Sequence, residues 1–273
     1  MRERSVALIA IALPVLSGLA YLWQTGAPQA YPATNAAALG LAAVLVYSAP
    51  AIETPKARRI LAAALIALLF LPLLTGPQVN GIARWLPLGP VALHAGALAL
   101  PPLLVLAARD EDFAPPILLA ALLAATLQPD AATGLAVVMA AVGLYNAKGD
   151  WRLVPVVAIA FFASLLAGLR GELPAQPYVE RVLIQQAMEH PLGALGLAGA
   201  LLACFLLIAH ALPAEKPVRH ALAGGHFGFS LAAVVSNYPS ILVGYGAAPI
   251  LGFGLAVGLA VAMARRTTGA PGT

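Results

Sequence analysis

The residues that could do chemistry are few, and one of them is an acid between two long apolar stretches. In the segment LQPDAATG (residues 127–134), Asp130 follows the apolar run Phe113–Leu127 with no room for a loop. An acid in such a place is costly unless it is paired, capped or hydrated. Pro129 can end the preceding helix, and Asp130 can cap the next one through backbone N–H groups two to three residues further on. Asp130 is therefore either a hinge cap or part of a site.

A second candidate is the cation of Arg84, which stands beside Trp85 in a polar interval between apolar stretches. A tryptophan ring favours a membrane–water interface, and a guanidinium offers phosphate a bidentate fork. Two interpretations are open for Arg84. It contacts the phosphates of lipid headgroups, or it is a fixed cation that faces the phosphates of an anionic lipid-linked substrate.

The third candidate is Glu180, in the polar interval 170–190. No proline or glycine interrupts residues 178–189, and their apolar members fall near one helical face, which predicts a short amphipathic helix. Glu180 can serve as a general base if a substrate lies within hydrogen-bond reach. The alternative is an ordinary charge on the polar face of that helix.

The five histidines and the single Cys204 lack metal-ligand spacing, so we expect no metal and no cofactor.

The elements that must position these residues are membrane helices. Of the 273 residues 61% are hydrophobic and 10% are charged, and the mean hydropathy is +0.90, which indicates an integral membrane protein. No polar stretch is long enough to bury a core of its own, so residues 1–273 form one transmembrane domain. The basic residues lie in short clusters between apolar runs, which is typical of topology signals and argues against a nucleic-acid partner.

The apolar runs predict an all-α bundle of about ten transmembrane helices. The first run, which extends to Trp23, has no convincing cleavage site and is expected to remain as an uncleaved helix. With the N-terminus in the cytoplasm, twelve of the 15 lysines and arginines lie inside, and Arg84, Arg170 and Arg181 lie outside. This bias obeys the positive-inside rule and places both termini in the cytoplasm. The expected spans are 5–24, 34–52, 59–75, 92–108, 113–129, 131–147, 152–170, 191–212, 220–236 and 239–264.

Three segments, in this order and on these spans, resemble the motifs of one family. NGIARWLPLGP (residues 80–90) resembles N-G-x-R-W-I-x-L-G, LQPDAATG (127–134) resembles L-Q-P-D-L-G-T-A, and GYGAA (244–248) resembles S-Y-G-G-S-S. These are motifs of the SEDS proteins (shape, elongation, division and sporulation; the FtsW/RodA/SpoVE group). The resemblance covers roughly residues 60–265, and the first two spans match by topology only.

The resemblance implies a multi-pass protein of the bacterial inner (cytoplasmic) membrane that serves peptidoglycan synthesis in cell division or cell-shape maintenance. Active members are glycosyltransferases that polymerise lipid II, usually beside a class B penicillin-binding protein. The expected partners are therefore membrane lipids, lipid II or a related undecaprenyl-linked precursor, and such a synthase. The matched motifs imply a substrate-binding role for Arg84, Trp85, Gln128, Asp130 and Tyr245.

The sequence also departs from the family pattern. Leu93–Ala97 stands where the family has F-Q-P-S-E, so the glutamate is missing, and the large outer loop is cut to about 20 residues. No aspartate occupies the family's catalytic position, where the alignment places Arg181 or, with a one-residue slip, Glu180. Glu180 could take a proton from an attacking sugar hydroxyl, whereas Arg181 stays charged and could not. Three hypotheses follow: a divergent glycosyltransferase with Glu180 as base, a catalytically silent regulator or scaffold of a cell-wall synthase, and, more weakly supported, a transporter or flippase of a lipid-linked precursor.

Overall fold

The structure, a computed structural model, describes residues 2–89, 91–171 and 173–267, with side chains up to residue 264. Pro90 of the first motif and the side chains of Arg265 and Arg266, which count among the inner cations, lie outside the described residues. The described elements are α1 (Arg2–Gln24), α2 (Ala30–Ser48), α3 (Pro55–Phe70), α4 (Pro72–Thr75), β1 (Trp85–Leu88), β2 (Val91–His94), α5 (Ala95–Ala108), α6 (Ala114–Leu127), α7 (Ala131–Lys148), α8 (Leu153–Arg170), α9 (Val182–Glu189), α10 (Pro191–Leu206), the π-helix η1 (Leu207–Ala211), α11 (Lys216–Val235) and α12 (Ala247–Thr267).

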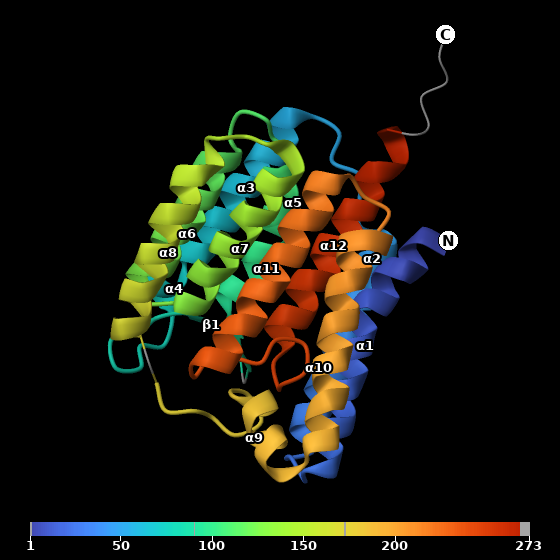
Figure 1. Cartoon of the computed structure of the whole chain (residues 1–273), viewed down its shortest axis with the longest axis vertical. Coiled ribbons are helices and arrows are strands. Elements are labelled where there is room, and N and C mark those ends of the chain that lie inside the picture. Colours follow the sequence, from blue (N-terminus) through green and yellow to red (C-terminus); the bar gives the residue numbers. More distant parts are fainter. Residues whose placement is uncertain (1, 90, 172, 268–273) are drawn as a thin grey trace.

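The chain is a polytopic helical bundle, and each expected span contains one principal helix of the described chain (Figure 1). Among the described residues, seven helical segments are long and apolar enough to cross a membrane: α1, α2, α3 with α4, α7, α8, α10 with η1, and α12. Helices α5 and α6 are apolar but shorter, and α11 has 20 residues with a polar beginning. The count of ten spans stays a prediction.

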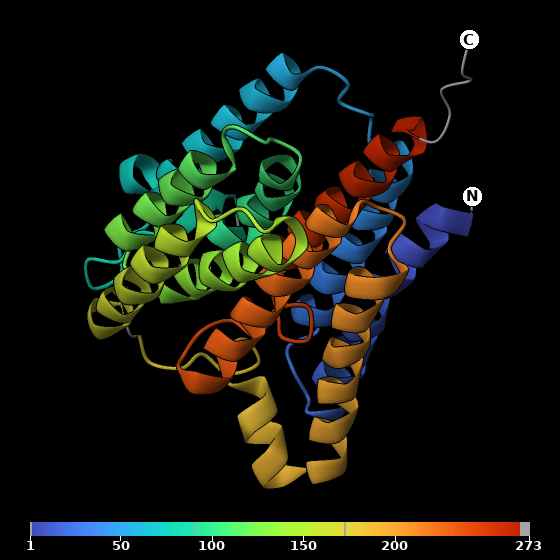
Figure 2. The ribbon, with the colours of Figure 1, turned by 45° about the horizontal axis from the view of Figure 1, so that its top comes forward.

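The bundle has two distinct ends. The first turn of α1 and the last turns of α12 lie toward one of them, which we call the inner end (Figure 1). The opposite, outer end carries the β-hairpin and α9, which projects below the bundle with the start of α10 (Figure 2). The cytoplasmic placement of the inner end is a prediction from the charge bias.

Three helix pairs approach closely because glycines lie where they cross. A Cβ atom on Gly224 of α11 would lie 2.2 Å from the carbonyl oxygen of Met139 in α7, and one on Gly252 of α12 would lie 2.3 Å from that of Ala97 in α5. Gly254 and Gly258 lie where α12 packs against α2. The small residues predicted on one face of the last span therefore serve close packing, as is common in membrane bundles, but they do so against two different helices.

The outer loop between α4 and α5 folds into a two-stranded antiparallel hairpin, which corrects the all-α prediction. Strand β1 pairs with β2 so that Trp85 faces His94 and Leu88 faces Val91. The expected span 92–108 consequently begins as a helix only at Ala95. Hydropathy alone could not separate Val91–His94 from the helix that follows, because a short apolar run fits a strand or a helix equally well.

Two other predicted boundaries are wrong for a related reason. The helix expected at 178–189 begins at Val182, and the last span, expected from residue 239, begins its helix at Ala247. The two segments that precede these helices instead form backbone hydrogen bonds with each other. Ser240 N donates to the carbonyl of Val179 at 2.8 Å, and Tyr245 N donates to that of Tyr178 at 2.7 Å. Pairing with a distant segment satisfies the backbone groups that a local helix would otherwise satisfy.

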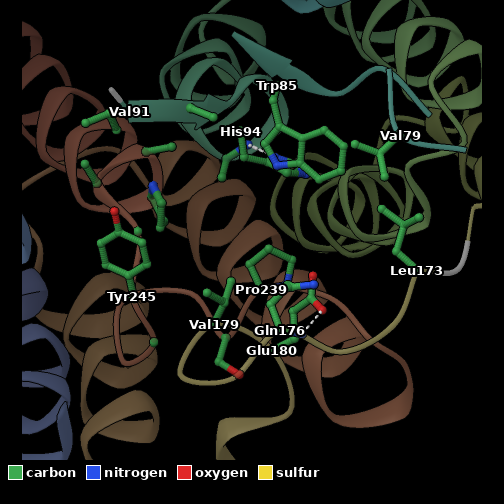
Figure 3. A pocket seen from close by; sticks show the side chains of 18 of the residues that line it. Val79, Trp85, Val91, His94, Leu173, Gln176, Val179, Glu180, Pro239 and Tyr245 are labelled. Carbon is green, nitrogen blue, oxygen red and sulfur yellow. Dashed lines mark hydrogen bonds between the residues drawn. The ribbon is translucent and has the colours of Figure 1, made fainter. Parts of the chain in front are cut away.

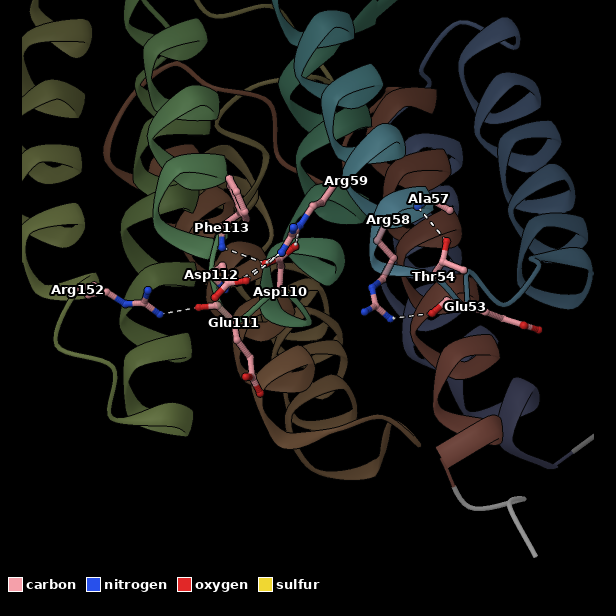
Figure 4. Close-up of polar contacts among 10 residues, drawn as sticks. All are labelled: Glu53, Thr54, Ala57, Arg58, Arg59, Asp110, Glu111, Asp112, Phe113 and Arg152. Carbon is pink, nitrogen blue, oxygen red and sulfur yellow. Dashed lines mark hydrogen bonds and ion pairs between the residues drawn. The ribbon is translucent and has the colours of Figure 1, made fainter.

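The inner end is joined by ion pairs (Figure 4). The guanidinium of Arg59 in α3 contacts Asp110 at 2.7 Å and Asp112 at 3.1 Å in the α5–α6 connection. Asp110 also accepts the backbone N–H groups of Asp112 and Phe113. These contacts hold the α5–α6 turn against α3.

Candidate functional site

A pocket of about 360 Å³ lies at the outer end, where three segments far apart in the sequence meet. Its residues come from the hairpin and the start of α5, from the connection between α8 and α9, and from the turn between α11 and α12. In Figure 3, Trp85 and Glu180 face the pocket from opposite sides and Tyr245 borders it on a third. Three of the six residues predicted for the site therefore line one cavity.

Glu180 is held in this pocket by its own loop. Its carboxylate accepts a hydrogen bond from the backbone N–H of Gln176 at 2.9 Å, and its backbone forms a bridge with Pro239. The residue is only 6% exposed. Burial raises the pKa of Glu180, while the bond from Gln176 and the charge of Arg84 partly oppose that rise. A raised pKa in a cleft is typical of a group that exchanges protons with a ligand.

The turn that carries Tyr245 is clamped by a buried asparagine. Asn35 of α2 is fully buried; its side-chain amide donates to the carbonyl of Gly244 and accepts the N–H of Gly246, both at 3.0 Å. The ring of Tyr245 stacks on Tyr31 with centroids 3.8 Å apart. These contacts fix the aromatic border of the pocket. The sequence analysis missed Asn35, although an amide inside an apolar span is a signal that it needs a partner.

Arg84 lies behind the pocket and does not line it. The residue is 2% exposed, and its guanidinium lies over the rings of Trp85 and Tyr238, at 5.1 and 5.0 Å from their centroids. Nη2 donates to the carbonyl of Gly171 at 2.8 Å. Contact with bulk headgroups, the simpler of the two interpretations, does not fit this burial.

The other two donor positions of Arg84 are notable. Nε and Nη1 are buried and have no hydrogen-bond partner within the described part of the chain. Such groups are rare in folded proteins because each costs about 1–3 kcal/mol when left unpaired. The charge nevertheless acts on the cavity, since Arg84 is within electrostatic reach of Glu180.

Asp130 caps α7, as its position after Pro129 predicted. Its carboxylate accepts the backbone N–H of Thr133 at 3.1 Å and also the hydroxyl of that residue. The residue is 1% exposed and lies 3.4 Å from Nε2 of His94. His94 accepts the N–H of Ala97 at Nδ1, which leaves its proton on Nε2, toward Asp130. The acid is thus capped and partnered, and it does not line the pocket.

Gln128 has a bracing role in the structure. Its side-chain amide donates to the backbone carbonyl of Leu69 in α3, and the residue is 2% exposed. Next to it, the backbone N–H of Ala131 donates to the hydroxyl of Tyr238 at 3.1 Å. Gln128 and Asp130 together fix the α6–α7 hinge beneath the hairpin.

The comparisons with known proteins concern the fold. No protein-family model matches the sequence, and no curated protein matches it. Among solved structures, an aspartate-to-alanine variant of the rod shape determining protein RodA from Thermus thermophilus superposes with a TM-score of 0.73 at 24% identity, covering 96% of this chain and 97% of that chain. The chain has the RodA fold.

Two further structures agree with this result. Thermus thermophilus RodA itself superposes with a TM-score of 0.68 at 24% identity, with 96% of each chain covered. A structure described as showing the structural coordination of polymerization and crosslinking by a peptidoglycan synthase complex gives a TM-score of 0.70 at 22% identity, covering 97% of this chain and 98% of that chain. The polytopic membrane fold that the three motifs implied is therefore confirmed over nearly the whole length.

Proposed function

We propose that this protein is a SEDS-like membrane protein of peptidoglycan synthesis that binds lipid II, or a related undecaprenyl-linked precursor, at the outer pocket. The observation that carries the proposal is the position of Glu180, a buried carboxylate with a raised pKa in a cavity bordered by Trp85 and Tyr245. The RodA fold of the chain supports the same assignment.

In the proposed reaction, Glu180 is the general base of a glycosyltransferase. It takes the proton from a sugar hydroxyl as that oxygen bonds to the anomeric carbon of a second substrate. The bond from that carbon to the lipid pyrophosphate breaks, and the pyrophosphate leaves with its lipid. Arg84 stabilises the growing negative charge from behind the pocket wall, where low dielectric strengthens its field.

The same proposal includes a cellular location and a protein partner. The protein resides in the bacterial cytoplasmic membrane, with the pocket on the outer face, where the charge bias places residues 76–91 and 170–190. The partner is a class B penicillin-binding protein. The similarity to a chain from a peptidoglycan synthase complex supports a partner of this kind.

Two observations favour a second candidate, a catalytically silent scaffold of a cell-wall synthase. The Glu180 carboxylate already accepts the N–H of Gln176, and Arg84 is separated from the cavity by the residues that cover it. In this case the pocket would bind the lipid carrier without reaction.

Purified protein in detergent with lipid II, alone and with a class B penicillin-binding protein, distinguishes the two candidates. If Glu180 is the base, Glu180→Gln lowers glycan-chain formation by roughly 10²–10⁴-fold, the usual contribution of a positioned base. Glu111→Gln is the matched control, because Glu111 is an exposed glutamate at the inner end. If the wild type forms no chains under any condition but still forms a stable complex with the partner, the scaffold candidate is correct.

A further inference from the structure

A second cavity, of about 330 Å³, lies in the inner half of the bundle between α7, the α10–η1 segment and α11. Most of its wall is apolar or small: Met139, Val142, Gly143, Phe205, Ala209, Ala223, Gly224 and Phe227. Its remaining lining residues are Asn146, His210 and His220. We call this cavity the inner groove and these three residues its rim.

The inner groove exists because three helices pack unequally. Helices α7 and α11 touch at Gly143 and Gly224, where a Cβ would lie 2.2 Å from a backbone oxygen of the other helix. Helix α10 packs mainly on α1 and on α9, and it diverges from α11 toward the outer end (Figures 1 and 2). At the inner end η1 closes the gap with π-helical turns, which are often found at functional sites.

The positive charge beside the rim is carried by Lys216 and Arg219 in the first turn of α11. His220 lies within electrostatic reach of Lys216, Arg219 and His210. Arg219 donates from Nη1 to the carbonyl of His210 at 3.0 Å, and its Nε is buried without a hydrogen-bond partner in the described part of the chain. The adjoining carboxylate of Glu215 is engaged by Arg109 at 3.0 Å. No aspartate or glutamate is among the residues that line the inner groove.

The basic residues and the apolar wall lie at the depths where a lipid places its headgroup and its acyl chains. Lys216 and Arg219 begin α11 at the inner end, and Lys148 ends α7 beside them. The rim therefore lies at a membrane surface, and the apolar wall runs from it toward the hydrocarbon. Basic pockets between helices at such a surface attract acidic headgroups. A helix of another protein would need an acid at this depth to match the same rim.

We propose that the inner groove binds an anionic phospholipid of the inner-end leaflet. The phosphate lies at the rim, near His210, His220 and the first turn of α11. One acyl chain lies along the wall between Val142 and Phe227. This assignment requires only the membrane setting of the bundle and is independent of the chemistry proposed at the outer pocket.

Native mass spectrometry of the full-length protein, titrated in detergent with phosphatidylglycerol or with phosphatidylcholine, tests the proposal. The wild type retains one phosphatidylglycerol in preference to phosphatidylcholine. The double variant Lys216→Gln/Arg219→Gln loses that preference, by about 5-fold for each cation removed. The matched control Lys56→Gln, an exposed lysine at the inner end of α3, keeps the preference of the wild type.

The variant Val142→Trp tests the apolar wall of the inner groove. Val142 is half-buried, and the indole ring of a tryptophan there fills the inner groove. It loses the retained lipid whichever headgroup is offered, and its thermal midpoint shows that it is folded. The proposal is overturned by equal retention of the two lipids, by retention that survives Val142→Trp, or by an equal loss in Lys56→Gln. A wild type that retains no lipid also overturns it.

Discussion

The inner and outer ends of the bundle differ in how they neutralise charge. At the inner end, Arg59 pairs directly with Asp110 and Asp112, and its side chain remains 40% exposed. At the outer end, Arg84, Asp130 and Glu180 are buried, and within the described part of the chain no ion pair joins Arg84 to an acid. The first arrangement holds a turn against a helix at a modest cost in desolvation. The second keeps charges desolvated and incompletely paired.

Incomplete pairing in a buried place costs stability, so it is typical of sites whose charges meet a ligand. Paired charges near a surface are worth little individually and report mainly on topology. This contrast supports the proposed site at the outer end. The predictions that follow test it from the largest expected effect to the smallest.

Removing the carboxylate of Asp130 should give the largest loss of stability. Asp130→Ala removes the cap of α7, worth ~1–2 kcal/mol, and leaves the buried hydroxyl of Thr133 without its acceptor, at about 1–3 kcal/mol. Thermal unfolding in detergent should show a free energy of unfolding lower by about 3 kcal/mol.

The companion variant Asp130→Asn separates the cap from the charge. An asparagine can still cap the helix, so the loss of stability should be smaller. If both fold and function survive, the cap is the whole role of Asp130. A stable Asp130→Asn protein without function shows that the negative charge itself is required. Equal destabilisation by the two variants would contradict the capping account.

Acid should weaken the inner end through Asp110. Arg59 and two backbone N–H groups lower the pKa of Asp110 from 3.8 to about 2. A depressed pKa contributes stability that is complete above pH 4 and is lost as the pH falls toward 2. With a partly exposed partner, the contribution is about 1–2 kcal/mol.

The measurement is the thermal midpoint between pH 5 and pH 2 for the wild type and for Asp110→Asn. The wild type should lose the stability of this pair across that window, and the variant should show a flatter profile. Asp112→Asn is the control, since Asp112 is 76% exposed and should change the profile little. Parallel profiles for the wild type and Asp110→Asn would show that the pair contributes nothing.

The smallest effect is expected at the pair of Asp150 and Arg152, in which the Arg152 side chain is 45% exposed. Exposed pairs contribute ~0–1 kcal/mol and are screened by salt. Asp150→Asn should change the free energy of unfolding by less than about 0.5 kcal/mol, and 1 M salt should remove the difference. A change as large as that of Asp130→Ala would break the contrast between the two ends.

Sequence reasoning located most of the fold because membrane helices are specified locally. An apolar run near the bilayer thickness must satisfy its own backbone groups, so each expected span overlaps one principal helix. The cap at Asp130 was predictable for the same reason, since Pro129 and the following N–H groups are its neighbours in sequence.

The candidate site was only partly predictable. Trp85, Glu180 and Tyr245 were singled out by type and motif, but their meeting in one pocket depends on contacts between segments far apart, such as Glu180 with Pro239. The burial of Arg84 depends on Tyr238, which stands 154 positions later in the printed sequence. Hydropathy and spacing carry no information about such pairs.

The sequence by itself determined that this is a membrane bundle, where its helices lie and which residues could do chemistry. These properties depend on local apolar length, charge and residue type. The tertiary structure alone decided that the outer loop is a hairpin, that Arg84 is buried behind the pocket and that Glu180 faces Trp85 across it. Those properties depend on long-range backbone and side-chain contacts, which no local pattern encodes.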